Sequence, residues 1–333
     1  MEMVNWGVLG TAGILGCTAK GMNLSEHCRL YAIAGRSKDK VDDFMAKYGF
    51  EKGYLSYDEL LDDEEISAVY IPLPNNLHYE WVMKALNKGK HVLCEKPLAP
   101  DAATAKKMFE TAKANNVYLM EAFAYQHSPY MEAVEKEISD GVIGNVRYIE
   151  TAFITSDYDN SNIRMRRETL GGAAYDLGVY NTSFILRVMG KVPDNIKATA
   201  SFSDNNIDLL TNGHIEYADG AKGTFTCGMV LETNADRRLD RFEIQGSKGT
   251  IRSGRFEYNL SGELTYEIVT FDECGNMNEP VMKSVKTPDN YMLEVEQLSM
   301  CILGESVPFV TEEFSVNNAE FLDGVLQAIG YYK

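Results

Sequence analysis

Two short polar motifs carry the residue types that proton transfer needs. Glu95-Lys96-Pro97 follows an apolar run, and Asp176 and Tyr180 stand four residues apart later in the chain. In a helix, that spacing puts Asp176 and Tyr180 on one face. An ammonium group lowers the pKa of a nearby phenol, and a carboxylate can orient either partner. We therefore expect Lys96, Asp176 and Tyr180 to be the catalytic residues.

The three side chains of Glu95-Lys96-Pro97 have different expected roles. Pro97 cannot continue a central strand and restricts Lys96 to an extended conformation, so it fixes where the lysine points. Lys96 is then able to hold a substrate oxygen, while Glu95 balances the charge. The alternative is an ordinary salt bridge at a strand end. Asp176 and Tyr180 have their own alternative, as a helix-terminus charge and a core residue. Whether Lys96 or Tyr180 donates the proton is left open.

A glycine-rich segment between the first predicted strand and helix is the candidate dinucleotide site. Residues 7–16 read GVLGTAGILG, at the point where a dinucleotide pyrophosphate rests on a helix N-terminus. With Gly10 as the first glycine of G-x-G-x-x-G, Ala12 and Leu15 take the other two places. The alternative is a glycine-rich turn that binds no nucleotide. The expected cofactor-binding residues here are Gly10, Thr11, Ala12, Gly13, Ile14 and Leu15.

The end of the second predicted strand, AGRSKDK, indicates the type of dinucleotide. NAD-binding domains typically have an Asp or Glu there for the ribose 2′-hydroxyl. This chain has Arg36 and Ser37, and a guanidinium favours a 2′-phosphate through charge-assisted hydrogen bonds. We therefore expect NADP(H) to be preferred, with NAD(H) as the second candidate. The alternative is that Arg36 lies in solvent and Asp39 binds the ribose.

Other strand ends of the same sheet add candidates, because ligands of open α/β sheets bind outside the carboxyl ends of the strands. His78 follows one such end. A lone histidine at a helix start is otherwise a packing residue. The further cofactor-binding candidates are Pro72, Leu73, Asn75, His78, Glu95 and Lys96.

The first part of the chain has the pattern of a doubly wound α/β domain. Apolar runs rich in Val, Ile and Leu alternate with segments of helical length. Continuously apolar runs are typical of parallel strands that are covered on both faces. We therefore predict a Rossmann dinucleotide-binding domain over residues 1–122. Its predicted strands are 3–9, 30–35, 66–74, 91–97 and 117–122.

From residue 123 the pattern changes. Most strand-like runs now alternate apolar and polar residues, and turn pairs such as Asp219-Gly220 and Lys248-Gly249 join them, which is typical of antiparallel hairpins. Residues 123–333 are therefore predicted to form an α+β substrate-binding and oligomerisation domain with a large open, mainly antiparallel sheet. The predicted strands are 146–155, 196–202, 208–220, 221–230, 241–254 and 264–273. The predicted helices are 130–141, 172–190, 291–304 and 314–332.

The bulk composition narrows the function classes. The chain has 333 residues, 45% of them hydrophobic, and a formal net charge of −17, which repels phosphate backbones and anionic lipid surfaces. We expect neither nucleic-acid binding nor membrane binding, and no apolar run is long enough for a membrane span. Six scattered cysteines indicate reduced thiols in the cytoplasm, and five histidines in no ligand spacing argue against a bound metal.

Several of these motifs occur together in one known family. The chain contains, in family order, WGVLGTAGI, AGRS, LPNNLH, CEKPL, LMEAF, GGAAYDLGVY, GTFTC and GSKGT. By these segments it resembles the glucose-fructose oxidoreductase and inositol dehydrogenase (Gfo/Idh/MocA) family of NAD(P)-dependent oxidoreductases. It is most similar to the dihydrodiol dehydrogenase-like branch, which uses NADP(H) on trans-dihydrodiols or sugars.

The resemblance implies a role for each motif. It gives catalysis to Lys96 of EKP and to Asp176 and Tyr180 of DLGVY. It also implies a cis peptide bond before Pro97 and places His78 at the nicotinamide. The large sheet of the second domain implies a homodimer or a dimer of dimers. The candidate substrate-binding residues are Phe123, Tyr158 and Arg164.

These observations together predict an NADP(H)-dependent oxidoreductase. It would interconvert a secondary alcohol and a carbonyl on a sugar-like or trans-diol substrate, by hydride transfer to or from nicotinamide C4. One alternative is a catalytically inactive dinucleotide or sugar sensor of the same fold. Another is an NAD-dependent polyol or inositol dehydrogenase. The sequence identifies neither the substrate nor the direction of the reaction.

Overall fold

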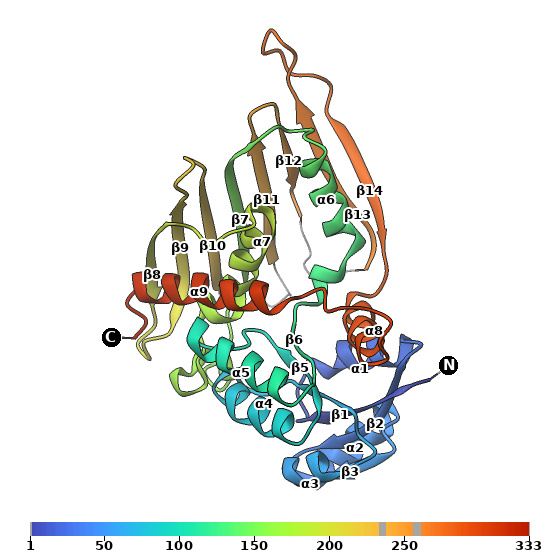
Figure 1. Cartoon of the computed structure of the whole chain (residues 1–333). Helices are drawn as coiled ribbons and strands as arrows, with labels where there is room; N and C mark the ends of the chain where they lie inside the picture. Colours follow the sequence, from blue (N-terminus) through green and yellow to red (C-terminus); the bar gives the residue numbers. More distant parts are fainter. Residues whose placement is uncertain (1, 233–237, 256–260, 333) are drawn as a thin grey trace. The chain divides into compact units, whose positions relative to one another are not determined.

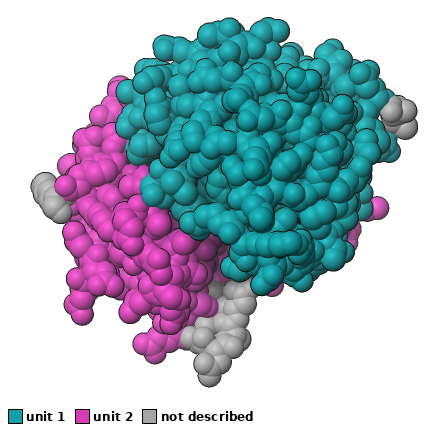
Figure 2. Space-filling model, turned by 90° about the horizontal axis from the view of Figure 1, so that it is seen from below, with its two compact units in different colours: residues 1–127, 288–316 teal, residues 128–287, 317–333 magenta. Residues whose placement is uncertain are grey.

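The structure is a computed structural model that describes residues 2–232, 238–255 and 261–332. The chain divides into two compact units (Figure 2), of which the first comprises Met1–His127 and Pro288–Val316 and the second Ser128–Thr287 and Asn317–Lys333. The first unit is therefore discontinuous in sequence. The sequence instead predicts one continuous second domain from residue 123, and that assignment of functional domains stays a prediction.

The first unit contains the parallel sheet that the sequence predicts (Figure 1). Six strands run in the order β3-β2-β1-β4-β5-β6, all with parallel pairing. This is the strand order of a Rossmann domain, so the predicted fold class of this part is confirmed. The strands are β1 (Val4–Leu9), β2 (Cys28–Ala34), β3 (Lys52–Tyr54), β4 (Ala68–Ile71), β5 (His91–Glu95) and β6 (Leu119–Ala122).

Helices connect the successive strands of this sheet, as parallel strands require. The central strands are continuously apolar because they are buried, as at all four positions of β4. The sequence does not predict β3, which has only three residues and two of them exposed. The connecting helices are α1 (Leu15–Leu24), α2 (Lys38–Tyr48), α3 (Tyr57–Asp62), α4 (His78–Asn87) and α5 (Ala102–Ala114).

A helix from the C-terminal part of the sequence completes the first unit. Helix α8 (Asn290–Ile302) packs on α1. Gly21 permits this approach, because a Cβ there would lie 2.6 Å from the backbone nitrogen of Met292. This packing is the physical reason why residues 288–316 group with the N-terminal part of the chain.

Polar side chains anchor α8 to the same unit. Trp6 Nε1 donates to Ser299 Oγ at 3.1 Å. The Glu296 carboxylate accepts from Ser25 Oγ at 2.5 Å and lies in an ion pair with His27. The hydrogen bond to Glu296 raises the pKa of His27, which favours the protonated, charged form of the imidazole in this ion pair.

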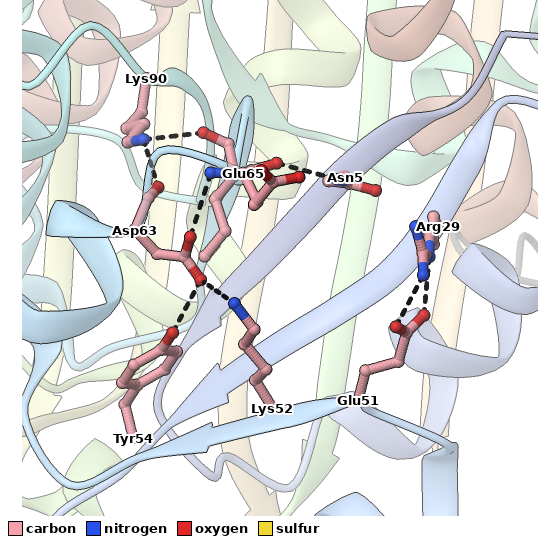
Figure 3. Close-up of polar contacts among 9 residues, drawn as sticks. Asn5, Arg29, Glu51, Lys52, Tyr54, Asp63, Glu65 and Lys90 are labelled. Carbon is pink, nitrogen blue, oxygen red and sulfur yellow. Dashed lines mark hydrogen bonds and ion pairs between the residues drawn. The ribbon is translucent and has the colours of Figure 1, made fainter.

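A polar network fixes the segment that leads into β4 (Figure 3). The buried Lys90 ammonium donates to the backbone oxygens of Asp63 and Ile66, both at 2.8 Å. The Asp63 carboxylate accepts from Tyr54 OH at 2.7 Å and from Lys52 Nζ at 3.0 Å. Burial alone would raise the pKa of Asp63, but these donors lower it. The network therefore ties the start of β4 to β3 and to the residue before β5.

The second unit contains the large, mainly antiparallel sheet that the sequence predicts (Figure 1). Eight strands run in the order β14-β13-β12-β11-β7-β10-β9-β8, and the pair β7 and β10 is parallel. The sequence does not predict β14, because its first four residues are all exposed and carry no alternation. The strands are β7 (Val146–Ser156), β8 (Asn195–Phe202), β9 (Asp208–Glu216), β10 (Lys222–Leu231), β11 (Arg238–Gly246), β12 (Gly249–Ser253), β13 (Gly262–Thr270) and β14 (Val281–Thr287).

Helices of the second unit pack against this sheet (Figure 1). Helix α6 (Pro129–Ser139) contacts β14, and α7 (Val179–Met189) contacts β7 and β10. Helix α9 (Glu312–Ala328) continues across the division between the units, which falls after Val316. Side chains along the strands alternate between a buried face and a face that keeps exposed surface, as in β11, where Asp240, Phe242 and Ile244 alternate with Arg241, Glu243 and Gln245.

Within residues 2–232, 238–255 and 261–332, no helix is both long and apolar enough to cross a bilayer.

Candidate active site

Lys96 stands immediately after β5, whose last residue is Glu95. Tyr70 OH donates to Glu95 Oε1 at 2.5 Å, and the Thr18 hydroxyl lies 3.1 Å from the Tyr70 oxygen. Burial, together with the Glu95 charge, raises the pKa of Tyr70, so the phenol keeps its proton. The peptide bond between Lys96 and Pro97 is cis, as the resemblance implies. Glu95 is thus oriented by a buried hydroxyl chain at the strand end from which Lys96 emerges.

Two buried side chains hold the turn after the lysine. His78 Nδ1 lies 2.9 Å from Pro97 O, and its Nε2 lies 2.8 Å from Leu73 O. Leu98 N donates to Glu121 Oε1 at 2.8 Å. The turn is therefore tied both to the loop after β4 and to β6, which restricts the backbone that carries the candidate catalytic ammonium.

His78 lies in this structure as a bridge between two loops. Both of its ring nitrogens face carbonyl oxygens, and the side chain is buried. Burial lowers the pKa of His78, and the charge of Lys96 lowers it further. A neutral imidazole donates from one nitrogen only, so it can serve one of these carbonyls at a time. The direct contact with the nicotinamide that the sequence predicts for His78 stays a prediction.

Glu121 is a titratable residue of this region that the sequence reasoning missed. It is 2% exposed, and burial raises its pKa to about 7. A carboxyl group with such a pKa changes its charge within the physiological range. The signal was present in the sequence, because Glu121 interrupts the predicted apolar strand VYLMEA.

The predicted glycine-rich loop lies between β1 and α1. Gly10 has φ +119, a conformation that disfavours any side chain, and a Cβ there would lie 3.1 Å from Leu73 Cδ2. A Cβ on Gly13 would meet no atom within 4 Å. Helical bonding starts with Leu15 N donating to Ala12 O, so the N–H groups just before it lie at the helix N-terminus. The loop therefore has the backbone of an anion-binding turn.

The loop after β2 brings Arg36 close to the glycine-rich loop. A Cβ on Gly35 would lie 3.0 Å from the Thr11 methyl group, so the two loops are in contact at that point. Arg36 and Ser37 are exposed, and so is Asp39, the alternative ribose ligand. An exposed guanidinium can form charge-assisted hydrogen bonds to a phosphate group, and the contact of Arg36 with a 2′-phosphate stays a prediction.

The loop after β4 contains the remaining candidates from the first unit. Pro72 and Leu73 are buried and follow the strand directly. Asn75 begins a short 3₁₀ helix, Asn75–Leu77, that leads into α4. The structure thus brings the candidates of this loop to the same end of the sheet as Glu95 and Lys96, because the carboxyl ends of parallel strands share one edge.

In the second unit, Asp176 and Tyr180 share one surface of a buried segment. Eight of the ten residues 171–180 are buried, and Asp176 and Tyr180 are the two that keep exposed surface. The segment contains a π-helical turn, Ala174–Gly178, that leads into α7. π-Helical turns are often found at functional sites. The exposure pattern agrees with the predicted common face of these two residues.

Arg164 forms an ion pair with Asp176. The Arg164 Nε to Asp176 Oδ2 distance is 2.7 Å, and the exposed fractions of the two side chains are 37% and 14%. The Asp176 charge raises the pKa of Arg164. The guanidinium also lies 5.0 Å from the centroid of the Tyr158 ring. The predicted substrate-binding residue Arg164 therefore lies next to both Tyr158 and Asp176.

Two aromatic side chains differ in their access to a ligand. The Phe123 ring is 0% exposed and packs edge-on against Tyr125 and Phe314, at centroid distances of 6.2 and 6.1 Å. Phe123 therefore lies in the core of the first unit, and its predicted contact with substrate stays a prediction. Tyr180 packs edge-on against Phe153 at 5.4 Å, which fixes its ring and leaves part of its surface exposed.

Each unit, taken by itself, presents side chains of the kinds that proton transfer uses. The first has an ammonium at a strand end, with oriented carboxyl groups nearby. The second has a carboxylate that is paired with a guanidinium, next to a phenol. Carboxylate, ammonium and phenol groups are those that general acid-base catalysis uses.

Family models match both parts of the chain. Residues 4–123 match a model described as "Oxidoreductase family, NAD-binding Rossmann fold", and residues 131–252 match a GFO/IDH/MocA C-terminal domain. An uncharacterized oxidoreductase of Rhizobium meliloti is 31% identical over 98% of this chain and 96% of its own length. A D-xylose 1-dehydrogenase (NADP(+)) of Haloferax volcanii is 30% identical over 97% and 96%.

Further relatives and a solved structure agree with these matches. A trans-1,2-dihydrobenzene-1,2-diol dehydrogenase of Xenopus laevis is 28% identical over 91% of this chain and 90% of its own length. A 3-ketoreductase from Actinomadura kijaniata, solved with NADP and TDP-benzene, is 25% identical with a TM-score of 0.89 over 98% of both chains. From the full-length relatives and the matched models, this chain belongs to the Gfo/Idh/MocA family of NAD(P)-binding Rossmann oxidoreductases and is an enzyme of the dehydrogenase and reductase kind.

Proposed function

We propose that the chain is an NADP(H)-dependent oxidoreductase that interconverts a secondary alcohol and a carbonyl on a sugar-like or trans-diol substrate. The observation that carries the proposal is the surface formed by Asp176, Tyr180 and Arg164. These three groups offer both donors and acceptors to neighbouring hydroxyl groups. The names of the xylose dehydrogenase and the dihydrodiol dehydrogenase support the same substrate class.

The first unit fits a dinucleotide cofactor. Gly10 has the positive φ of a turn that approaches a phosphate closely, and the side of Gly13 is open. The nicotinamide would supply the hydride acceptor or donor. The residues that would hold the cofactor are Gly10, Thr11, Ala12, Gly13, Ile14 and Leu15, Arg36 and Ser37 at the ribose, and Pro72, Leu73, Asn75, His78, Glu95 and Lys96 at the strand ends.

Replacing Arg36 with alanine is expected to weaken NADPH binding selectively. Loss of a charge-assisted hydrogen bond to the 2′-phosphate raises the Kd for NADPH by about 10- to 100-fold. The Kd for NADH should change by less than about threefold, because NADH has no 2′-phosphate. Titration of nicotinamide fluorescence measures both constants. Lys38→Ala is the matched control, since Lys38 is exposed and paired with Asp42. A wild type that binds NADH more tightly than NADPH contradicts the proposed preference.

The chemical step divides between the two sets of residues. Lys96 holds the substrate oxygen and stabilises negative charge on it. Tyr180 accepts or donates the hydroxyl proton, as a phenol can do in general acid-base catalysis. Asp176, which is paired with Arg164, orients the hydroxyl groups of the substrate. The proposal thus gives Lys96, Asp176 and Tyr180 separate roles in one reaction.

A substrate screen tests this function. The enzyme is incubated with NADP⁺ and, separately, with pyranoses, inositols and trans-diols, and the formation of NADPH is followed. We expect turnover within the sugar or trans-diol classes that the Lys96→Met variant does not show. Turnover of inositols with NAD⁺ alone would favour a polyol dehydrogenase instead. No turnover of any polyol with either cofactor would contradict the proposal.

The exposed face of the second sheet is the proposed self-association surface. The alternation along β11 leaves one face with exposed surface, and the family resemblance implies a homodimer or a dimer of dimers through such a sheet. Sedimentation equilibrium gives the oligomeric state directly, and a monomer at micromolar concentration contradicts the dimer.

We further propose that the enzyme acts in the cytoplasm.

A further inference from the structure

A buried carboxyl group lies at the start of the segment that carries Asp176 and Tyr180. Asp208, the first residue of β9, is 0% exposed. Its Oδ2 accepts from the backbone nitrogen of Ala174 at 2.7 Å and from Thr211 Oγ1 at 2.9 Å. Ala174 is the first residue of the π-helical turn, so the carboxylate caps that turn. Asp208 Oδ1 has no hydrogen-bond partner among the described residues.

A glycine makes room for this carboxylate. Gly172 has φ +117, and a Cβ there would lie 2.0 Å from Asp208 Oδ1. Gly172 N also donates to Arg164 O at 2.8 Å, and Asp176 N donates to Gly172 O at 3.0 Å. The loop that positions Arg164 and the helical turn that positions Asp176 therefore both bond to Gly172. Asp208 packs against this same glycine.

A second anchor comes from the end of the chain. Tyr331 OH donates to the backbone oxygen of Gly171 at 2.8 Å, and Tyr331 is 1% exposed. The Arg167 guanidinium lies 3.6 Å from the centroid of the Tyr331 ring, and its Nη1 donates to Asn206 O at 2.8 Å. The segment 171–174 is thus held from β9 by a carboxylate, at Ala174, and from the C-terminal segment by a phenol, at Gly171.

We propose that Asp208 is a positioning residue: its ionised carboxylate, together with Tyr331, sets the place of Asp176 and Tyr180, and protonation of Asp208 loosens that arrangement. This inference rests on the proposed function for the roles of Asp176 and Tyr180. An ionised acceptor at a helix N-terminus binds the N–H groups more strongly than a neutral one. Losing the charge therefore weakens the bond to Ala174.

The environment of Asp208 sets the pH at which this happens. Burial raises its pKa to about 6 from 3.8, while the Ala174 and Thr211 donors and the Arg167 charge act in the opposite direction. The other titratable groups in its surroundings are Tyr331 and Cys227, whose pKa values are raised by burial. The cap should therefore weaken as the pH falls through about 6.

The free energy of unfolding should depend on the protonation of Asp208 in the opposite sense to the strength of the cap. A carboxyl group with a raised folded pKa makes a contribution to stability that is complete below its unfolded pKa and is lost as the pH rises through its folded pKa. Acidification through the Asp208 pKa, which is about 6, therefore does not unfold the protein through this group. Activity should fall on the acid side while the fold stays intact, which a merely structural role would not produce.

The test compares Asp208→Asn, Asp208→Ala and Asp204→Asn in the full chain. The amide of Asn keeps an acceptor without a charge, and Asp204 is an exposed carboxylate in the loop just before β9. The readouts are kcat as a function of pH, circular dichroism, and amide hydrogen exchange of residues 171–180. We expect the wild-type kcat to decline below about pH 6 without unfolding. In Asp208→Asn, kcat should no longer decline at acid pH, and at high pH it should be about tenfold lower than in the wild type. Asp204→Asn should match the wild type.

Hydrogen exchange separates this inference from the proposed function. It needs no substrate, so it reports on positioning even if every polyol fails as a substrate. Faster exchange of residues 171–180 in Asp208→Ala supports the inference, and unchanged exchange overturns it. A folded Asp208→Asn variant that keeps the wild-type acid limb also overturns it. If Asp208→Ala does not fold, Tyr331→Phe takes its place, since it removes only the hydroxyl group that binds Gly171.

Discussion

Replacing Lys96 with methionine is expected to lower kcat by about 10²- to 10⁴-fold, the range that positioned proton-transfer groups contribute. Methionine keeps an unbranched apolar stem but removes the ammonium that holds the substrate oxygen. Although Lys96 is also a candidate cofactor contact, the Kd for NADPH should change by less than about threefold, because the other cofactor-binding candidates, which would hold the phosphates and the ribose, are unchanged. Steady-state kinetics and fluorescence titration measure the two quantities on one preparation.

The matched control for Lys96 is an exposed lysine of the same unit. Lys106 lies on α5 with its side chain exposed, so Lys106→Met removes one positive charge without touching the strand ends. Its kcat should equal that of the wild type. If Lys96→Met retains the wild-type kcat, the ammonium takes no part in the reaction. If it loses NADPH binding instead, Lys96 acts on the cofactor rather than on the substrate.

The second large effect is expected at the ion pair between Arg164 and Asp176. Asp176→Asn should lower kcat/KM by about 10²- to 10³-fold, since truncating one partner of a partly buried charge pair leaves the other unpaired. Arg164→Met should cost a similar factor. The loss of transition-state free energy in the double variant should be smaller than the sum of the losses in the two single variants. The difference, the coupling free energy, should be about 1 to 2 kcal/mol. Kinetics of the four proteins give this coupling.

A surface pair serves as the control for this cycle. Lys136 and Asp140 form an exposed pair four residues apart, with 73% and 50% of their side-chain surface exposed. Exposed pairs of this kind contribute little. The same cycle on this pair should give no measurable coupling in kcat/KM. Additive effects of Asp176→Asn and Arg164→Met would show that the ion pair does not act as a unit in catalysis.

The architecture followed from local patterns wherever the pattern and the burial agreed. β4 is apolar throughout because it is buried on both faces, and β11 alternates because one of its faces keeps exposed surface. β3 and β14 were missed because most of their residues are exposed, so no apolar periodicity is visible in the sequence. Hydrophobic periodicity predicts a strand only where burial selects the residues.

The candidate site was predictable only in part. The spacing of Asp176 and Tyr180 predicted a shared face, because it depends only on one short helical segment, the π-helical turn and the start of α7. The bond between Arg164 and Asp176 depends instead on a turn at Gly171 and Gly172, which folds the preceding loop back on the helix. The cap from Asp208 joins residues 34 positions apart, and no local pattern reports such a contact.

The packing of α8 on α1 has a consequence for the order in which the protein matures. The hydrogen bond between Trp6 and Ser299 spans 293 positions, and Gly21 is shaped to receive the backbone near Met292. During synthesis the N-terminal strands leave the ribosome long before their partner helix exists. The apolar surface of the first unit that α8 covers therefore stays exposed until almost the whole polypeptide has been translated. Long-range closure of this kind is slow, and exposed apolar surface in the interval is what chaperones recognise.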